Sequence, residues 1–118
     1  MKFGVLFSII FLFNTCNGQS QNNAEATTPN GMTSKFKVYG NCGMCEKRIE
    51  KAAKIEGVTY ADWDEDSKIL TITFDSTKVK PGQVHKAVAA VGHDTDKERA
   101  SDKVYANLPE CCHYERRQ

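Results

Sequence analysis

Two groups of cysteines carry the residue types in this sequence that could do chemistry. Cys42 and Cys45 are separated by two residues in the stretch GNCGMC, and Cys111, Cys112 and His113 follow one another near the end of the chain. Thiolates bind thiophilic metal ions, exchange with disulfides, or form structural bridges. The first two uses would make Cys42 and Cys45 functional residues, whereas the third would only fasten a turn.

No constellation typical of an enzyme accompanies these cysteines. The sequence shows no Ser-His-acid set, no carboxylate pair in an evident pocket and no glycine-rich phosphate loop. The formal net charge is +1, and no basic-aromatic run marks a nucleic-acid surface. We therefore expect a protein that is not an enzyme and has no nucleic-acid partner.

Residues 1–18 are predicted to be a signal peptide. Lys2 precedes an apolar run at residues 4–13 (GVLFSIIFLF), which is too short to span a bilayer and has the length of a signal-peptide hydrophobic region. A hydrophobic anchor and a buried core strand are the alternatives for this run. We expect the chain to be exported, either to the periplasm of a bacterium or as a membrane-anchored lipoprotein.

Cys16 is a candidate site of lipid attachment. The segment LFNTC, which ends at Cys16, resembles a bacterial lipobox, although Phe13 and Thr15 stand where other residues are usual. Ordinary cleavage near Gly18 is the competing interpretation. The next segment, residues 19–33, is rich in Asn, Gln, Ser and Thr and is predicted to be a flexible linker.

The elements that must position Cys42 and Cys45 follow from the hydrophobic pattern of the chain. Apolar residues alternate in some segments and recur at helical spacing in others, and Gly57 and Gly92 are typical helix stops. His85 is expected on the solvated side of its helix and not as a ligand. The predicted strands are residues 35–39, 58–63 and 68–74, with a hairpin loop at 64–67, and the predicted helices are 45–55 and 81–92.

This order of elements indicates an α+β fold, the ferredoxin-like split βαβ sandwich, in which two helices cover one face of an antiparallel sheet. The elements read βαββα, and the fourth strand is expected to be short or missing because residues 93–99 are polar. A third helix is predicted at 96–107. Residues 34–95 should therefore form the domain, and residues 96–118 a C-terminal helix with a Cys-rich tail.

Residues 34–95 resemble the heavy-metal-associated domain, a family of small ferredoxin-like metal carriers and metal-binding modules of heavy-metal pumps. The resemblance rests on Gly40-x-Cys42-x-x-Cys45 at the first helix, on the element order and on Gly92. It implies that Cys42 and Cys45 are the metal ligands. It also implies a metal-transporting membrane protein or another metal carrier as the partner.

Two further expectations come from this family. Met44 should turn its thioether into the core, and His93 occupies the position from which an aromatic residue or a lysine often approaches the metal. His93 is therefore a candidate additional ligand.

The chemistry of the cysteines favours Cu(I) as the ion that is transferred or sequestered. Cys45 falls in the first helical turn, where unpaired amides and the helix dipole stabilise a thiolate. Two thiolates can hold Cu(I) in a nearly linear, open geometry, and Zn(II) or another thiophilic ion is the alternative. A periplasmic thiol-disulfide redox protein that uses Cys42 and Cys45, or a domain with structural disulfides, remains a rival interpretation.

The tail raises a second question. Cys111, Cys112 and His113 are candidate additional ligands that could form a second soft-metal site, complete the site at Cys42 and Cys45, or bridge to the main domain by a disulfide. An intervening helix of about a dozen residues, rising roughly 1.5 Å per residue, would let the tail return to the first loop.

Overall fold

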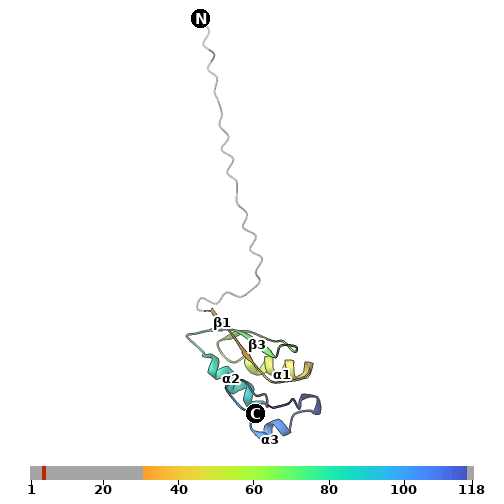
Figure 1. Cartoon of the computed structure of the whole chain (residues 1–118). Helices are drawn as coiled ribbons and strands as arrows, with labels where there is room; N and C mark the ends of the chain where they lie inside the picture. The colour runs from red at the N-terminus through yellow and green to blue at the C-terminus, as the bar shows by residue number, and fades with distance from the viewer. Residues whose placement is uncertain (1–3, 5–30, 117–118) are drawn as a thin grey trace.

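The computed structural model describes residue 4 and residues 31–116. The predicted signal peptide, apart from Gly4, and the candidate lipid site at Cys16 lie outside the described residues, as does most of the linker. Figure 1 shows the described chain as a small sheet with helices packed beneath it. The elements in chain order are β1 (Gly31–Lys37), α1 (Gly43–Ala53), β2 (Val58–Trp63), β3 (Ile69–Asp75), α2 (Pro81–Ala90), α3 (Asp102–Ala106) and the 3-10 helix η1 (Glu110–Cys112).

The three strands form one antiparallel sheet in the order β1-β3-β2. Leu70 of β3 pairs with Phe36 of β1 on one side and with Trp63 of β2 on the other. These three residues are buried, as are Ile72 and Phe74 farther along β3. Successive side chains of a strand point to opposite faces, so the alternating apolar residues of β3 all face the helices.

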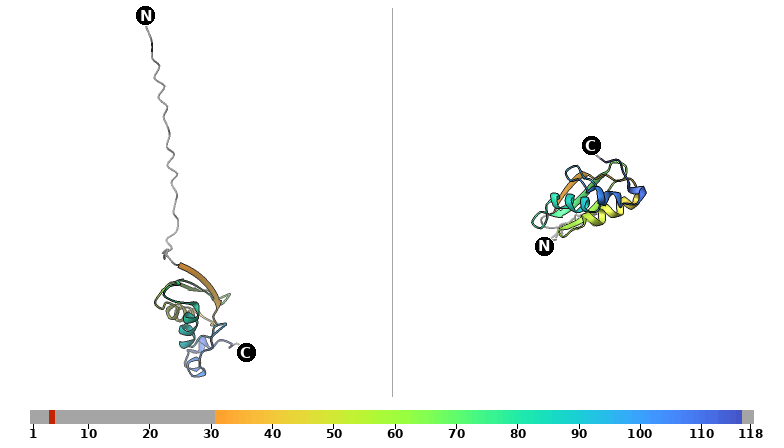
Figure 2. Two further views of the ribbon diagram at one scale, coloured as in Figure 1. Left: turned by 90° about the vertical axis from the view of Figure 1, so that its left-hand side faces the viewer. Right: turned by 90° about the horizontal axis from the view of Figure 1, so that it is seen from below.

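Helices α1 and α2 cover that face of the sheet, as the view from below shows (Figure 2). Ile49 and Ala53 of α1 and Val84 and Val88 of α2 are fully buried in the common core. Removing a larger apolar side chain such as isoleucine or valine from water contributes about 1.5–3 kcal/mol. The predicted α+β ferredoxin-like fold is therefore confirmed.

The fourth strand is reduced to a single bridge between Val38 and Thr95. The Tyr39 amide donates to the Asp94 carbonyl at 2.8 Å, next to this bridge. Thr95 and Asp94 are fully buried, and their side chains bond to other parts of the chain. The polar segment after α2 therefore stabilises the fold through side-chain hydrogen bonds in place of a strand ladder.

Three predictions about the elements were wrong in detail. β1 covers Gly31–Lys37 in place of the predicted 35–39, because the strand stays paired with β3 from Gly31, opposite Asp75, to Lys37, opposite Ile69. The third helix covers only Asp102–Ala106, in place of the predicted 96–107. The segment before it forms a bend instead, because Thr95 Oγ1 accepts from the Lys97 and Glu98 amides and the Asp94 carboxylate accepts from the Ala100 amide.

His85 is the third correction, because it is buried and not solvated. Only 2% of its surface is exposed, its ring stacks on Phe36 with centroids 3.8 Å apart, and its Nδ1 lies 2.6 Å from Thr95 Oγ1. The segment after α2 folds back over this side of the helix, which the pattern within the helix alone does not reveal. Burial lowers the pKa of His85, although Asp96 opposes that effect.

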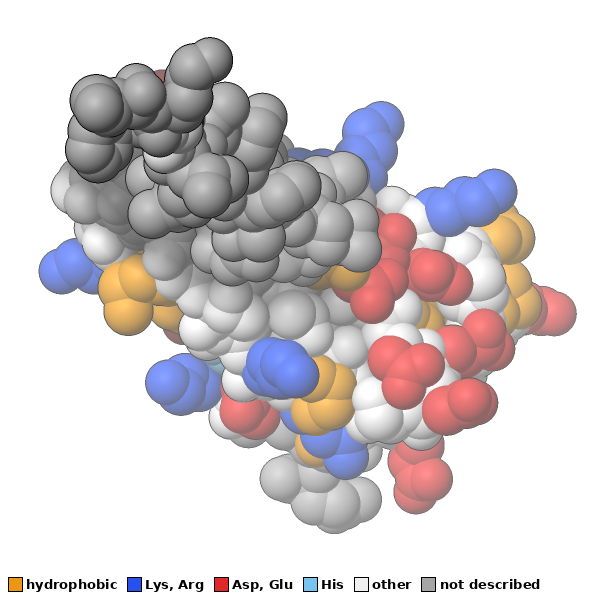
Figure 3. All heavy atoms as spheres, turned by 90° about the horizontal axis from the view of Figure 1, so that it is seen from above, with side chains coloured by type: hydrophobic (Ala, Val, Ile, Leu, Met, Phe, Trp, Pro, Cys, Tyr) orange, Lys and Arg blue, Asp and Glu red, His pale blue; other side chains and the backbone are white. Residues whose placement is uncertain are grey.

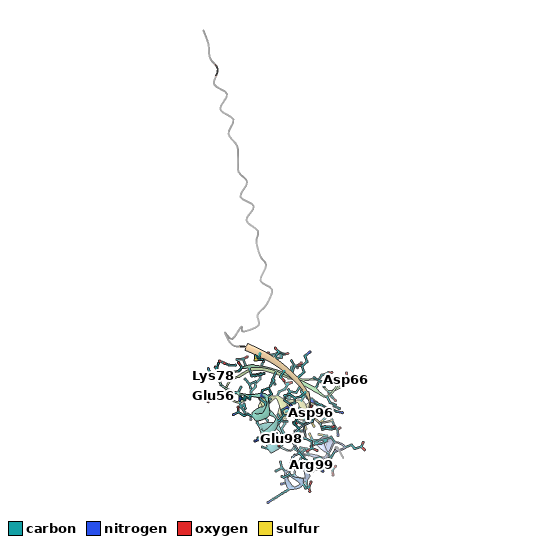
Figure 4. All side chains as sticks on the ribbon, turned by 60° about the vertical axis from the view of Figure 1, so that its left-hand side comes forward. Glu56, Asp66, Lys78, Asp96, Glu98 and Arg99 are labelled. Atoms are coloured by element: carbon teal, nitrogen blue, oxygen red, sulfur yellow. The ribbon has the colours of Figure 1, made fainter. Side chains whose placement is uncertain are left out.

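The surface carries charge of both signs. Acidic side chains gather mainly on the right of the face seen in Figure 3, whereas lysine and arginine side chains are scattered over its left, lower middle and upper right. In Figure 4, Asp66 lies at the opposite end of the domain from Glu56 and Lys78. Among the residues that the structure describes, no helix is long and apolar enough to cross a membrane.

Candidate metal centre

The loop between β1 and α1 places the first two cysteines at the start of the helix. Cys42 is the N-cap of α1, and Cys45 lies in the first turn and is fully buried. Gly40 lets the loop pack tightly, since a Cβ there would lie 3.1 Å from both Cys45 and the Trp63 ring. The helix amides that lack intrahelical partners therefore lie close to both sulfur atoms.

The C-terminal tail brings two more thiols to this loop. Cys42 Sγ lies 3.5 Å from Cys45 Sγ, 3.6 Å from Cys112 Sγ and 3.1 Å from Cys111 Sγ. The sulfurs of Cys42, Cys45 and Cys112 all lie within 4.8 Å of one another. Cys112 is fully buried, whereas Cys111 is exposed. The tail therefore returns to the first cysteine pair, a position from which both a shared metal site and a disulfide to the main domain are within reach.

A network of polar contacts holds the tail in place beyond the cysteines. The Tyr114 hydroxyl donates to the Gly92 carbonyl at 2.7 Å and accepts from the Asp94 amide at 2.8 Å. The Arg116 guanidinium binds both Asp94 carboxylate oxygens, at 3.0 and 2.8 Å. Tyr114 and Asp94 are buried, so these bonds form where water cannot replace them.

The turn at the end of α2 fits the same packing. Gly92 has a φ of 108°, a left-handed conformation that favours glycine, and a Cβ there would lie 2.9 Å from a methyl carbon of Leu108. Leu108 precedes η1 and is buried. The predicted helix stop at Gly92 is therefore also the position where Leu108 packs against the turn after α2.

Arg48 places a positive charge beside the cluster of cysteine thiols. Its Nη1 donates to Cys112 Sγ at 3.2 Å from the second turn of α1. A guanidinium beside sulfur stabilises the thiolate over the thiol. Arg48 was not among the site residues predicted from the sequence. Its position three residues after Cys45, on the same face of the helix, is the signal that could have identified it.

The four thiols hold their protons unequally. Desolvation raises the pKa of Cys42, but hydrogen bonds from the Cys111 thiol and the Cys45 amide outweigh it and lower that pKa to about 6. Burial raises the pKa of Cys45 and of Cys112, and the hydrogen bond to Cys42 raises that of Cys111. One thiolate therefore forms readily at Cys42, and a bound cation would displace the other protons.

The two candidate histidine ligands lie apart from these sulfurs. His93 is fully buried, its Nδ1 lies 2.9 Å from the Tyr39 carbonyl oxygen, and its Nε2 has no hydrogen-bond partner. His113 is exposed beside the Tyr105 ring. Within residues 31–116, the group of mutually close ligand atoms around Cys42 contains three thiols and neither histidine.

Met44 is exposed, contrary to the prediction that it enters the core. Its exposed fraction is 53%, and its Sδ lies 3.7 Å from Cys111 Sγ. The first turn of α1 turns Cys45 inward, and Met44, one residue earlier, therefore points to solvent. Met44 also borders a shallow groove of about 640 Å³. The other residues that line the groove are Lys47, Arg48, Lys51, Ala52 and Val91.

The fold and the thiol group define a small α+β module with a soft-ligand site at the start of its first helix. Residues 36–94, half of the 118 residues, match the family model of the heavy-metal-associated domain. The chain belongs to this family, as its cysteine motif and element order predicted. The matched residues include Cys42 and Cys45 and end before Cys111 and Cys112.

Solved structures of similar proteins agree with this assignment. The CopZ metallochaperone is 30% identical, with a TM-score of 0.53 over 54% of this chain and 98% of its own. Oxidised MerP from Ralstonia metallidurans CH34 is 29% identical, with a TM-score of 0.53 over 56% of this chain and 94% of its own.

A third similar structure is the Cu(I)-loaded N-terminal domain of a potential copper-translocating P-type ATPase from Bacillus subtilis. It is 27% identical, with a TM-score of 0.52 over 55% of this chain and 84% of its own. A comparison with curated proteins gave no significant match.

Proposed function

We propose that this protein is an exported carrier that binds Cu(I) through Cys42 and Cys45 and transfers or sequesters it. The observation that carries the proposal is the pair of sulfurs 3.5 Å apart at the start of α1. Soft thiolates select thiophilic ions, and the helix N-terminus offsets the negative charge of the complex. The similar ATPase domain in its Cu(I)-loaded state supports Cu(I) over Zn(II).

Native mass spectrometry of reduced protein, purified from medium supplemented with copper and zinc, tests this function. We expect Cu(I) on the wild type and none on the Cys42→Ser/Cys45→Ser variant. The His113→Ala variant is the matched control, since it removes a ligand-type side chain close to the tail thiols in sequence and should keep the ion. Metal retained by the double variant, with an unchanged circular dichroism spectrum, would contradict the proposal.

The groove beside the thiol group supports a metal-transporting membrane protein or another metal carrier as the partner. The groove is lined by Lys47, Arg48 and Lys51. Met44 also lines it, and the Met44 sulfur contacts the Cys111 sulfur. The positive charge of the groove fits an acidic metal-receiving domain. A Lys47→Glu/Lys51→Glu variant should load Cu(I) normally but transfer it more slowly to such a domain. An unchanged transfer rate would exclude the groove as the docking site of the partner.

Export and lipid attachment belong to the same proposal. The apolar run at residues 4–13 supports export, and the position of Cys16 after it supports a lipid anchor. Mass spectrometry of protein from the membrane fraction should find an acylated N-terminus at Cys16. A free N-terminus at Gln19 would exclude the lipid, and protein confined to the cytoplasm would exclude export.

A thiol-disulfide redox protein is the second candidate function. The lowered pKa of Cys42 and its 3.1 Å distance from Cys111 Sγ favour it, because thiolates attack disulfides. The reduction potential separates the two functions. A reduction potential close to those of oxidising thiol-disulfide proteins, together with turnover of a disulfide substrate, would favour redox chemistry over metal transfer.

A further inference from the structure

We infer that the C-terminal tail closes the metal site: Cys112 is a third thiolate ligand beside Cys42 and Cys45, and Cys111 is a fourth, exchangeable one. This inference rests on the proposed function of the first two cysteines and extends it to residues beyond the matched domain. The site then holds a thiophilic d10 ion by three sulfurs, or by four when Cys111 joins. Such a site retains its ion more firmly than a pair of cysteines does.

The distances between the sulfurs fit this coordination. A metal–sulfur bond of about 2.3 Å puts the ligands of a tetrahedral ion roughly 3.8 Å apart, and two opposed ligands roughly 4.6 Å apart. The observed separations are 3.5 Å from Cys42 to Cys45, 3.6 Å from Cys42 to Cys112 and 3.8 Å from Cys111 to Cys112. These three separations fit a site with three or four ligands, whereas Cys42 Sγ and Cys111 Sγ, which lie 3.1 Å apart, would have to move roughly 0.7 Å farther apart for both to bind one ion.

The surroundings of Cys112 argue against a simple packing role. A buried cysteine often behaves as a small apolar residue, and its sulfur then contacts aliphatic side chains. Cys112 packs in the core, but its sulfur also lies beside the thiols of Cys42 and Cys111 and accepts a hydrogen bond from the Arg48 guanidinium at 3.2 Å. Those neighbours suit an anionic ligand, because they satisfy and offset a charge on sulfur.

The tail is held in this position by contacts that do not involve the thiols. Leu108 packs against Gly92 before the cysteines, and Tyr114 and Arg116 bind Gly92 and Asp94 after them. A ligand that is fixed in place before binding loses less conformational entropy when the ion arrives. The tail is therefore a preorganised part of the site.

The charge balance is also favourable. Three thiolates give Cu(I) a complex of charge −2, which Arg48 and the positive end of α1 partly offset. Binding releases the thiol protons to solvent and leaves the oxidation state of the metal unchanged.

Cys111 and Met44 provide the route of exchange. Both are exposed, and their sulfurs lie 3.7 Å apart at the surface of the site. An incoming thiolate from a partner can replace Cys111 without opening the buried part of the site.

Metal affinity and coordination of single variants test this inference. We expect Cys112→Ser to lower the Cu(I) affinity at least tenfold in competition with a chromophoric chelator, and Cys111→Ser to lower it less. X-ray absorption of the Cu(I)-loaded protein should count three or more sulfurs in the wild type and two in Cys112→Ser/Cys111→Ser. His113→Ala is the matched control and should behave as the wild type does.

The outcomes distinguish a failure of this inference from a failure of the proposed function. Two sulfurs in the wild type, or an affinity unchanged in the tail double variant, would overturn the inference and leave Cys42 and Cys45 as the site. Metal retained without those two cysteines would overturn the proposed function. Because Cys111 is exposed, its single variant keeps the fold even where replacement of buried Cys112 disturbs it.

Discussion

At the scale of single residues, the chemistry of the site depends on positive charge supplied by the protein as well as on the cysteine sulfurs. Arg48 contacts Cys112, and Cys42 lies at the positive end of α1. The spacing of Cys42 and Cys45 was enough to predict a thiol site. Arg48 escaped prediction because a basic residue on an amphipathic helix is ordinarily a solvated one, and only the return of the tail gives it a partner.

Replacing Arg48 should weaken metal binding without removing it. We expect Arg48→Ala to lower the Cu(I) affinity about tenfold, because a hydrogen bond to a charged group contributes about 1.5–3 kcal/mol. The measurement is a chelator competition at fixed pH and ionic strength. Lys47→Ala, which removes an exposed charge from the same helix, is the control, and an equal effect of both variants would point to net charge instead of the contact.

At the scale of elements, the order of strands and helices followed from the sequence, whereas two features depended on contacts between distant segments. The alternating residues of β3 and the apolar spacing of α1 are local patterns, and both elements lie within about two residues of their predicted bounds. The burial of His85 and the shortness of α3 come from bonds to Thr95 and Asp94. Such bonds between segments leave no periodic signal in the sequence.

The packing of α1 against the sheet should carry a large part of the stability. Ile49→Ala removes a fully buried side chain and is expected to lower the free energy of unfolding by about 2–5 kcal/mol. Urea denaturation of the reduced, metal-free protein measures this change. Lys51→Ala, exposed on the same helix, should change it by less than about 0.5 kcal/mol. A similar small loss for Ile49→Ala would contradict the core assignment.

The turn after α2 should tolerate no side chain. We expect Gly92→Ala to destabilise the protein by about 1–3 kcal/mol, because alanine is strained at a φ of 108° and its methyl group meets Leu108. Gly82→Ala is the control, since a Cβ there has open space around it in the first turn of α2. Thermal denaturation compares the two, and equal melting temperatures would contradict the packing at Gly92.

At the scale of the whole molecule, the tail joins the end of the chain to the domain through Asp94 and Arg116. The sequence alone left three arrangements open for Cys111 and Cys112. The length of the intervening segment shows that the tail can extend as far as the first loop, but not where it packs. The contacts that bring the tail back beside Cys42 and Cys45 involve Tyr114 and Gly92, residues that no ligand motif contains. Sequence patterns could therefore predict the types of the candidate ligands, but not that the two cysteine groups lie side by side.

The ion pair between Asp94 and Arg116 makes part of the stability of the fold dependent on pH. Burial opposes the charge of Asp94, but hydrogen bonds from Arg116 and the Ala100 amide outweigh it and hold the pKa of Asp94 below its usual value. A carboxyl with a lowered folded-state pKa stabilises the fold above its unfolded pKa, about 3.9, and loses that contribution as the pH falls through the folded value. The wild type should therefore lose stability below about pH 4.

Melting temperatures between about pH 2 and pH 6, a range that brackets this loss, test the expectation. Asp94→Asn should be less stable than the wild type at the upper end of the range, and the difference should shrink as the pH falls. Asp102→Asn is the matched control, because Asp102 binds the same arginine but is 91% exposed, and its change should be small. A constant difference between Asp94→Asn and the wild type at all pH values would contradict the assignment.

The position of Trp63 has a consequence for how this protein can be observed. It is the single tryptophan of the chain, its Nε1 donates to the Val38 carbonyl, and its ring flanks Gly40 near Cys45. Tryptophan fluorescence, excited at a wavelength where the four tyrosines do not absorb, therefore comes from one indole that packs against the loop of Cys42 and Cys45. A heavy ion bound by the thiols would quench that emission, and unfolding would shift it to longer wavelength. One unlabelled signal thus distinguishes the loaded, empty and unfolded forms.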